Sequence, residues 1–266
     1  MKGEARKGWR TALVTGASSG IGRAFAVALA QRGADLVVIA RRRSELDKLA
    51  ADLIGAHGRS VEVLAADLTD PEERAKVEAR LSDLDRPIDM LVNAAGFGTQ
   101  GFFAELPVER EEQEILLNVV ALVRLTRAAL PAMVQRQQGA VVNLSSLAGD
   151  QAIPMWATYS ATKAYVTTFS RAVDAELTGT GVRVHVVRPG FTRTEFHQQS
   201  GFRREMIPGP AWMTAEEVAE GALNRLARGR GESVPGLHYR ALGLASRLAP
   251  RALTREVLRI ATRDMR

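Results

Sequence analysis

The chain of 266 residues contains no cysteine, few aromatic residues and no long uninterrupted apolar run. Without cysteine there are no disulfide bonds, thiol nucleophiles or thiolate metal sites, and this composition favours a cytoplasmic location. No apolar run approaches the roughly 20 residues needed to cross a bilayer. The N-terminal segment MKGEARKGWR is charged throughout, so we do not expect a secretory signal.

Positive charge is concentrated at the C-terminal end. The net charge is +6, and the ten arginines and three acids between 225 and 266 contribute +7 of it. From Arg247 to Arg263 an arginine recurs every fourth residue, which indicates a basic amphipathic segment, divided at Pro250. We expect it to cover the pocket or a subunit interface. Peripheral membrane contact is the less favoured alternative, because the tail lacks Trp and Phe anchors. Nucleic acid is not an expected partner, since no binding motif is present.

Short β-branched runs alternate with longer segments of helical periodicity. We expect strands at 11–15, 36–40, 61–66, 89–93, 140–145, 182–188 and 232–235. We expect helices at 20–32, 44–56, 71–83, 109–136, 157–178 and 214–228. This alternation predicts an α/β fold with a doubly wound parallel sheet and helices on both faces. No linker or repeat interrupts it, so we expect one domain over 1–236, with a substrate loop at 190–212. A basic helical extension would follow at 237–266.

A glycine-rich segment, TGASSGIG at 15–22, separates the first strand from the first helix. Its spacing matches neither G-x-G-x-x-G nor the phosphate loop of NTPases. The N-terminus of a helix nevertheless attracts phosphate, and open parallel sheets bind ligands at their C-terminal strand ends. Gly16 would allow the turn, while Gly20 and Gly22 lack the Cβ atoms that would hold a pyrophosphate away. We favour nucleotide binding over a simple strand-to-helix turn.

A tyrosine and a lysine, Tyr159 and Lys163, stand four residues apart in the segment YSATK. On a helix this spacing places both side chains on one face, about 5–6 Å apart at Cβ. A phenol with a pKa near ~10 exchanges protons poorly at neutral pH, and a neighbouring ammonium lowers that pKa. The pair is therefore a candidate general acid/base unit. Taken alone it is a weak signal, because the spacing occurs by chance on many surface helices.

With both motifs present, the sequence resembles the short-chain dehydrogenase/reductase family in its compact single-domain branch. The motifs stand in the family's order: T-G-x-x-x-G-x-G at 15–22, NAAG at 93–96, Asn118, NLSS ending at Ser146, YSATK, and RPGFTRT at 188–194. The resemblance extends from about residue 11 to 194, and more loosely to about 236. It implies a Rossmann-like fold and NAD(P)-dependent interconversion of an alcohol and a carbonyl compound.

The resemblance also implies the catalytic roles. Tyr159 would exchange a proton with the substrate oxygen, and Ser146, thirteen residues upstream, would hydrogen-bond the same oxygen; Ser145 is the alternative. Lys163 would lower the pKa of Tyr159 and bind the nicotinamide ribose. Asn118 would hold a water that links Lys163 to solvent, unless it only bonds locally within its helix. No metal is expected, because the cofactor carries the hydride.

The end of the second strand predicts NADP(H) rather than NAD(H). Ala40 occupies the position at which NAD-preferring members carry an acid, and Arg41 follows with a guanidinium suited to a 2′-phosphate. Arg42 or Arg43 would assist, unless the three arginines are simply solvated. A second basic residue is absent from the glycine turn. The remaining implied cofactor contacts are Gly16, Ser18, Ser19, Gly20, Ile21, Gly22, Asp67, Leu68, Asn93, Ala94, Gly96, Tyr159, Lys163, Pro189, Gly190, Thr192 and Thr194.

Large apolar side chains gather in the segments where this family selects its substrate. They are Phe97, Phe102, Met155, Trp156, Phe191, Phe196, Phe202, Met206 and Trp212. Burial of apolar carbon stabilises a complex by roughly 25 cal/mol per Å², so we expect an apolar ketone, aldehyde or alcohol as substrate. Alternatively, these residues pack a lid or a subunit contact.

Two further expectations concern assembly and a competing function. The resemblance implies a homodimer or homotetramer formed through the two long central helices. The competing hypothesis is a catalytically silent NADP(H)-binding sensor or scaffold that contacts a partner or membrane through its basic tail. We rank it second, because the chain has both the tyrosine and the lysine.

Overall fold

The computed structural model describes residues 9–196, 209–236 and 239–240. Among these residues seven strands form one parallel sheet in the order β3-β2-β1-β4-β5-β6-β7. The strands are β1 (Thr11–Thr15), β2 (Asp35–Ala40), β3 (Val61–Ala65), β4 (Met90–Asn93), β5 (Gly139–Leu144), β6 (Val182–Val187) and β7 (Glu232–Ser233). The strand order reverses between β1 and β4, and in such sheets ligands bind beyond the strand ends at this point.

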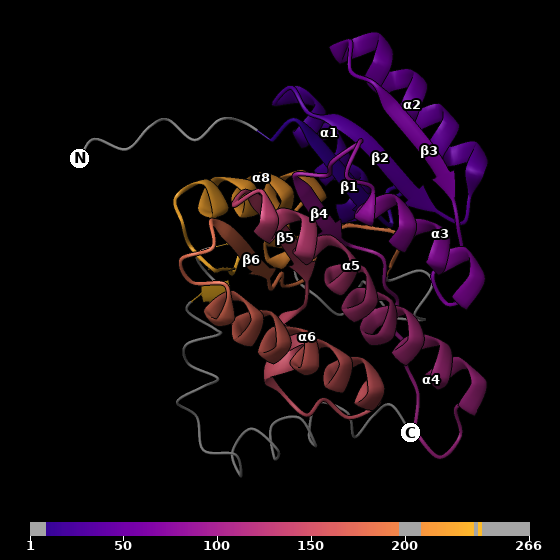
Figure 1. The fold of residues 1–266 in the computed structure, drawn as a ribbon. Coiled ribbons are helices and arrows are strands. Elements are labelled where there is room, and N and C mark those ends of the chain that lie inside the picture. Colours follow the sequence, from indigo (N-terminus) through magenta and orange to yellow (C-terminus); the bar gives the residue numbers. More distant parts are fainter. Residues whose placement is uncertain (1–8, 197–208, 237–238, 241–266) are drawn as a thin grey trace.

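Helices cover both faces of the sheet (Figure 1). One face packs against α1 (Gly20–Gln31), α2 (Arg43–His57) and α8 (Ala215–Ala227), and the other against α3 (Pro71–Ser82), α5 (Leu122–Gln135) and α6 (Ala157–Glu176). Phe25 and Leu29 belong to the first core, and Leu125 and Met133 to the second. Because both faces are covered, the central strands are apolar almost throughout.

Local signals explain where two of the helices begin. Pro71 occupies the first turn of α3, and the Asp70 carboxylate accepts hydrogen bonds from the backbone N–H groups of Glu72 and Glu73. At α8, Thr214 and Glu217 form a reciprocal capping box. These contacts satisfy N–H groups that the first helical turn leaves unpaired.

The helix expected at 109–136 has three parts. These are α4 (Val108–Ile115), a π-helical turn η1 (Leu116–Ala121) that contains Asn118, and α5. Short π-helical turns occur frequently at functional sites. In the described part of the chain, Val108–Gln135 is the one helix long and apolar enough to span a membrane. Leu125 and Met133 pack against the sheet, as in a core helix.

The predicted α/β architecture is confirmed, and most element ends differ by one or two residues from those expected. The strand expected at 232–235 is shorter and spans Glu232–Ser233. Phe202, Met206 and nearly all of the extension 237–266 lie outside the described residues. The proposed division of the chain at 236 and the role of the arginine-rich tail therefore stay predictions.

Candidate active site

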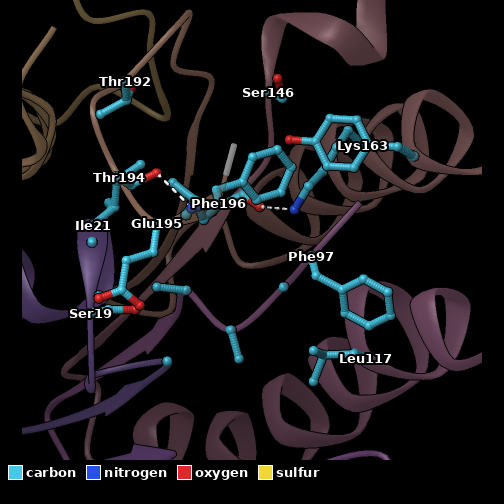
Figure 2. Close-up of a pocket in the computed structure, with 18 of the residues that line it drawn as sticks. Ser19, Ile21, Phe97, Leu117, Ser146, Lys163, Thr192, Thr194, Glu195 and Phe196 are labelled. Carbon is cyan, nitrogen blue, oxygen red and sulfur yellow. Dashed lines mark hydrogen bonds between the residues drawn. The ribbon is translucent and has the colours of Figure 1, made fainter. Parts of the chain in front are cut away.

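A cavity of about 720 Å³ lies at the C-terminal ends of the central strands. Sites for cofactors and small ligands typically have volumes of about 300–1,000 Å³. The predicted site residues that line it are Gly16, Ser18, Ser19, Gly20, Ile21, Gly22, Arg41, Arg42, Asp67, Leu68, Ala94, Gly96, Ser146, Tyr159, Lys163, Pro189, Gly190, Thr192 and Thr194. Figure 2 shows Ser19 and Ile21 of the glycine turn beside Thr194 and Glu195, and all four residues line this cavity.

The glycines of the turn are required by close backbone packing. Gly16 has φ +67°, and a Cβ there would lie 2.9 Å from the Cα and N atoms of Ala95. A Cβ on Gly22 would lie 2.3 Å from the Gly16 carbonyl oxygen. The Thr15 hydroxyl accepts hydrogen bonds from the backbone N–H groups of Ala94 and Ala95, which joins this turn to the end of β4.

The first turn of α1 has the properties of an anion site. Ser19 occupies the N-cap position, but its side chain makes no capping hydrogen bond, and the first turn contains no acidic residue. The N–H groups of this turn therefore lack the side-chain partners found at α3 and α8. Together with the positive end of the helix dipole, they suit a phosphate group.

Replacing Gly22 by alanine should weaken NADPH binding by at least about tenfold, because the turn has to move to admit the new methyl group. Gly55→Ala is the matched control, since Gly55 lies within α2 and has no atom within 4 Å of an added Cβ. Fluorescence titration with NADPH measures both affinities. Equal affinity in wild type and Gly22→Ala would contradict the assignment of this turn to the cofactor.

Two arginines after β2 reach the same end of the cavity. Arg41 lies 3.8 Å from the Asp67 carboxylate, and its side chain is 72% exposed. Arg42 donates hydrogen bonds to the Ser18 hydroxyl at 3.2 Å and to the Glu195 carboxylate at 3.1 Å. Arg42 thus brings to the glycine turn the second positive charge that the turn itself lacks. Arg43 does not line the cavity and instead lies 3.6 Å from Asp47 on its own helix.

Tyr159, Lys163 and Ser146 meet beside the end of β5. Lys163 is 5% exposed and its ammonium donates to the Leu144 carbonyl at 3.0 Å. The same ammonium lies 5.7 Å from the centre of the Tyr159 ring. Ser146 hydrogen-bonds the Tyr159 phenol. The neighbouring Ser145 hydroxyl donates a hydrogen bond to the Lys163 carbonyl and is also hydrogen-bonded to the Thr167 hydroxyl. The geometry therefore favours Ser146 over Ser145 as the serine that binds the substrate oxygen.

The pKa of Tyr159 differs from the sequence-based expectation. Burial raises it to about 12; the hydrogen bond with Ser146 opposes this rise, and the charge of Glu114 adds to it. Burial also lowers the pKa of Lys163 to about 8, against the opposing charge of Glu114. The expected lowering of the tyrosine pKa by the lysine is therefore outweighed, because removing both groups from water disfavours the phenolate and the ammonium alike.

Asn93 and Asn118 do not line the cavity, and the side chains of both make hydrogen bonds within the protein. Asn93 donates to Thr126 and Asn143 beneath the end of β4, so it supports the strand ends rather than facing the cavity. Asn118 bonds both backbone groups of Phe97 and donates to Thr162. Its amide thus holds the segment after NAAG, and its expected role in holding a water stays a prediction.

Aromatic residues surround Tyr159 at the other end of the cavity. Trp156 and Phe196 lie with ring centres 5.5 and 5.3 Å from that of Tyr159. Phe97 and Phe191 also line this cavity, which is the environment expected for an apolar substrate. The other described members of the predicted set, Phe102, Met155 and Trp212, do not line it.

Tyr239 also lines the cavity, although it was not among the predicted site residues. Its ring covers Gly190, where an added Cβ would lie 2.2 Å from it. Its hydroxyl accepts from the Phe191 N–H at 2.9 Å and donates to the Ala211 carbonyl at 2.6 Å. Tyr239 therefore holds together the two described ends of the 190–212 loop. The one available signal was an isolated aromatic residue in an arginine-rich segment.

A doubly wound parallel sheet with a glycine-rich turn at its switch point defines a Rossmann-like α/β protein. A model of the short chain dehydrogenase family matches residues 10–204. An uncharacterized oxidoreductase from Myxococcus xanthus is 36% identical over 228 residues, which are 86% of this chain and 88% of the relative. The chain therefore belongs to the short-chain dehydrogenase/reductase family and has the fold of its oxidoreductases.

Two solved structures resemble the chain along most of its length. A short-chain dehydrogenase from Sphingobium yanoikuyae in complex with NADPH is 40% identical, with a TM-score of 0.83, covering 92% of this chain and 94% of the other. The bulky-bulky ketone specific alcohol dehydrogenase from Comamonas testosteroni is 33% identical, with a TM-score of 0.79. The alignment covers 91% of this chain and 93% of the dehydrogenase.

Proposed function

We propose that the protein is an NADP(H)-dependent oxidoreductase that interconverts an alcohol and a ketone or aldehyde on an apolar small molecule. One observation carries this proposal: Ser146, Tyr159 and Lys163 line the same cavity as the glycine turn. The Tyr159 phenol, which would exchange the proton, therefore shares one cavity with the N-terminus of α1, which would bind phosphate. The competing hypothesis, a silent sensor, gains no support from this arrangement.

The residues of the cavity fit a nicotinamide dinucleotide. Gly16 and Gly22 would allow the diphosphate to approach the backbone, and Arg41 and Arg42 would hold an additional phosphate on the adenosine ribose. Asp67, beside Arg41, would accept a hydrogen bond from the adenine amine. When bound, NADPH supplies a hydride for reduction, and NADP+ accepts one for oxidation. The NADPH complex of the Sphingobium relative supports this choice of cofactor.

Tyr159 would act as general acid in reduction and as general base in oxidation. At neutral pH its burial keeps the phenol protonated, so it can donate to the carbonyl oxygen. The Ser146 hydroxyl would give this oxygen a second hydrogen bond and hold it in place. Lys163, when charged, stabilises the phenolate that remains after proton transfer.

The aromatic lining supports an apolar and bulky substrate. Phe97, Trp156 and Phe196 offer flat apolar surfaces near the Tyr159 phenol. The relative named for bulky-bulky ketones is similar over 91% of this chain. We therefore expect aryl alkyl ketones to be better substrates than sugars or small charged acids.

A screen of alkyl phenyl ketones tests the proposed function. We expect oxidation of NADPH, followed by absorbance, to accelerate from acetophenone to its longer-chain homologues, and to exceed the rate with NADH. Aliphatic ketones and aldehydes of graded length complete the panel. If the purified protein binds NADPH but does not oxidise it with any of these carbonyl compounds, this result contradicts the proposal and favours the silent sensor.

We also propose a homodimer or homotetramer. The central helix region exposes apolar side chains, since Val108 is 70% exposed and Ile115 is 45% exposed, both on α4. Covering these side chains with a second copy would remove apolar surface from water. Light scattering coupled to size-exclusion chromatography should give a mass of two or four chains, and a monomeric mass at micromolar concentration would refute this proposal.

A further inference from the structure

Glu114 is a buried carboxyl group that the proposed reaction does not use. It lies on α4 and is 0% exposed, and Glu111, one turn earlier on the same helix, is 6% exposed. Burying an ionised carboxylate is costly unless hydrogen bonds or opposite charges compensate for the lost water. Two acids buried side by side therefore need a physical explanation.

Thr99 connects the two carboxyl groups. Its hydroxyl lies 2.7 Å from Glu114 Oε2 and also contacts Glu111 Oε1, while its backbone N–H donates to Glu114 Oε2 at 2.8 Å. The Thr158 hydroxyl donates a hydrogen bond to the other carboxylate oxygen of Glu111, Oε2. A hydroxyl group has one proton to donate. Both Thr99 contacts are full hydrogen bonds only when one of the carboxyl groups carries a proton.

Glu114 is the member of the pair better suited to carry this proton. Its Oε1 atom has no hydrogen-bond partner among the described residues. Burial raises the pKa of Glu114 and the charge of Glu111 adds to the rise, whereas hydrogen bonds from Thr99 and the charge of Lys163 oppose it. Glu114 therefore changes its charge at a higher pH than an exposed glutamate.

This acid pair is coupled to the catalytic residues through both contacts and charge. Thr158 directly precedes Tyr159, and Thr99 follows Gly98, where an added Cβ would lie 2.8 Å from the Tyr159 ring. The charge of Glu114 raises the pKa of both Tyr159 and Lys163. The described charged groups that shift the pKa of Glu114 include Glu111 from α4 and Lys163 from α6, and Tyr159 from α6 is coupled to Glu114 as well.

We propose that Glu114 is a titratable positioning residue, which acts on the substrate through Tyr159 and Lys163 rather than by contact. When neutral, it holds the segment around Thr99 against Tyr159 by a shared proton. When charged, it keeps the ammonium of Lys163 protonated as the solution becomes alkaline. This inference rests on the proposed function, because it concerns the same tyrosine and lysine.

The pH dependence of ketone reduction tests the inference in the variant Glu114→Gln. With its amide oxygen in the place of Oε2, glutamine can still accept hydrogen bonds from the N–H and the hydroxyl of Thr99, but it never becomes charged. Without the negative charge, Lys163 and Tyr159 lose their protons at lower pH. We expect the alkaline limb of kcat/KM, measured with the fastest alkyl phenyl ketone of the screen, to move down by about half a pH unit or more.

Glu112→Gln is the matched control, because Glu112 is an exposed residue of the same helix and the change removes the same charge. Its alkaline limb should coincide with that of the wild type. An unchanged alkaline limb in folded Glu114→Gln would overturn the inference, and so would an equal shift in both variants.

Thermal unfolding provides a second measurement that does not depend on turnover. A carboxyl group whose pKa is raised in the folded state loses its stabilising effect as the pH rises through that value. The Tm of Glu114→Gln should therefore increase relative to wild type between about pH 5 and about pH 8. A Tm difference that is independent of pH would overturn the inference. Failure of the wild type to reduce any carbonyl would instead contradict the proposed function.

Discussion

Phenylalanine in place of Tyr159 should lower kcat for ketone reduction by roughly two to four orders of magnitude, the usual contribution of a positioned general acid. The change removes one oxygen atom and keeps the ring, so the contacts with Trp156 and Phe196 persist. Because the proposed role of the phenol is to act on the substrate oxygen, the Kd for NADPH should change by no more than about twofold. Stopped-flow or steady-state NADPH oxidation, together with fluorescence titration, gives both quantities.

Tyr165→Phe supplies a matched control for this experiment. Tyr165 lies on the same helix, α6, and is 45% exposed, with its ring stacked on that of Phe169. The same chemical change at this position should leave kcat and the NADPH affinity unaltered. Comparable turnover in Tyr159→Phe and wild type would exclude Tyr159 as the proton donor and with it the proposed mechanism.

Alanine in place of Arg41 or of Arg42 should weaken NADPH binding by about tenfold or more, and NADH binding by no more than about twofold. The expected difference arises because, in the proposed complex, a guanidinium would pair with the additional phosphate of NADPH, which NADH lacks. Both side chains are partly in water, since Arg41 is 72% and Arg42 is 47% exposed, so each effect should weaken at high salt. Titration of each nucleotide at low and high ionic strength measures these changes.

Arg43→Ala is the control for both substitutions. Arg43 belongs to the same run of three arginines, but it pairs with Asp47 and does not line the cavity. Its removal should affect neither nucleotide. If Arg41→Ala and Arg42→Ala weakened NADH and NADPH equally, the arginines would not distinguish the two cofactors, and the preference for NADP(H) would have to be abandoned.

Much of the fold follows from local pattern. Apolar β-branched runs such as LVVIA, and helix starts such as TDPEE, lie where the strands and helices are found. The π-helical turn around Asn118 was not predicted, because the apolar periodicity of the sequence continues through it without a break. The side-chain partners of Asn118, Phe97 and Thr162, come from other elements and leave no trace in the spacing of the helix itself.

The sequence by itself determined the order of strands and helices, the glycine turn and the tyrosine–lysine pair, because each depends on residues within a few positions of one another. Tertiary structure alone decided which arginine reaches that turn: Arg42 contacts Ser18 and Glu195, 24 and 153 residues away. It also decided that burial raises the pKa of Tyr159 and that Glu114 acts on it. Desolvation and long-range charge depend on which distant segments fold around a group, and no local spacing encodes that arrangement.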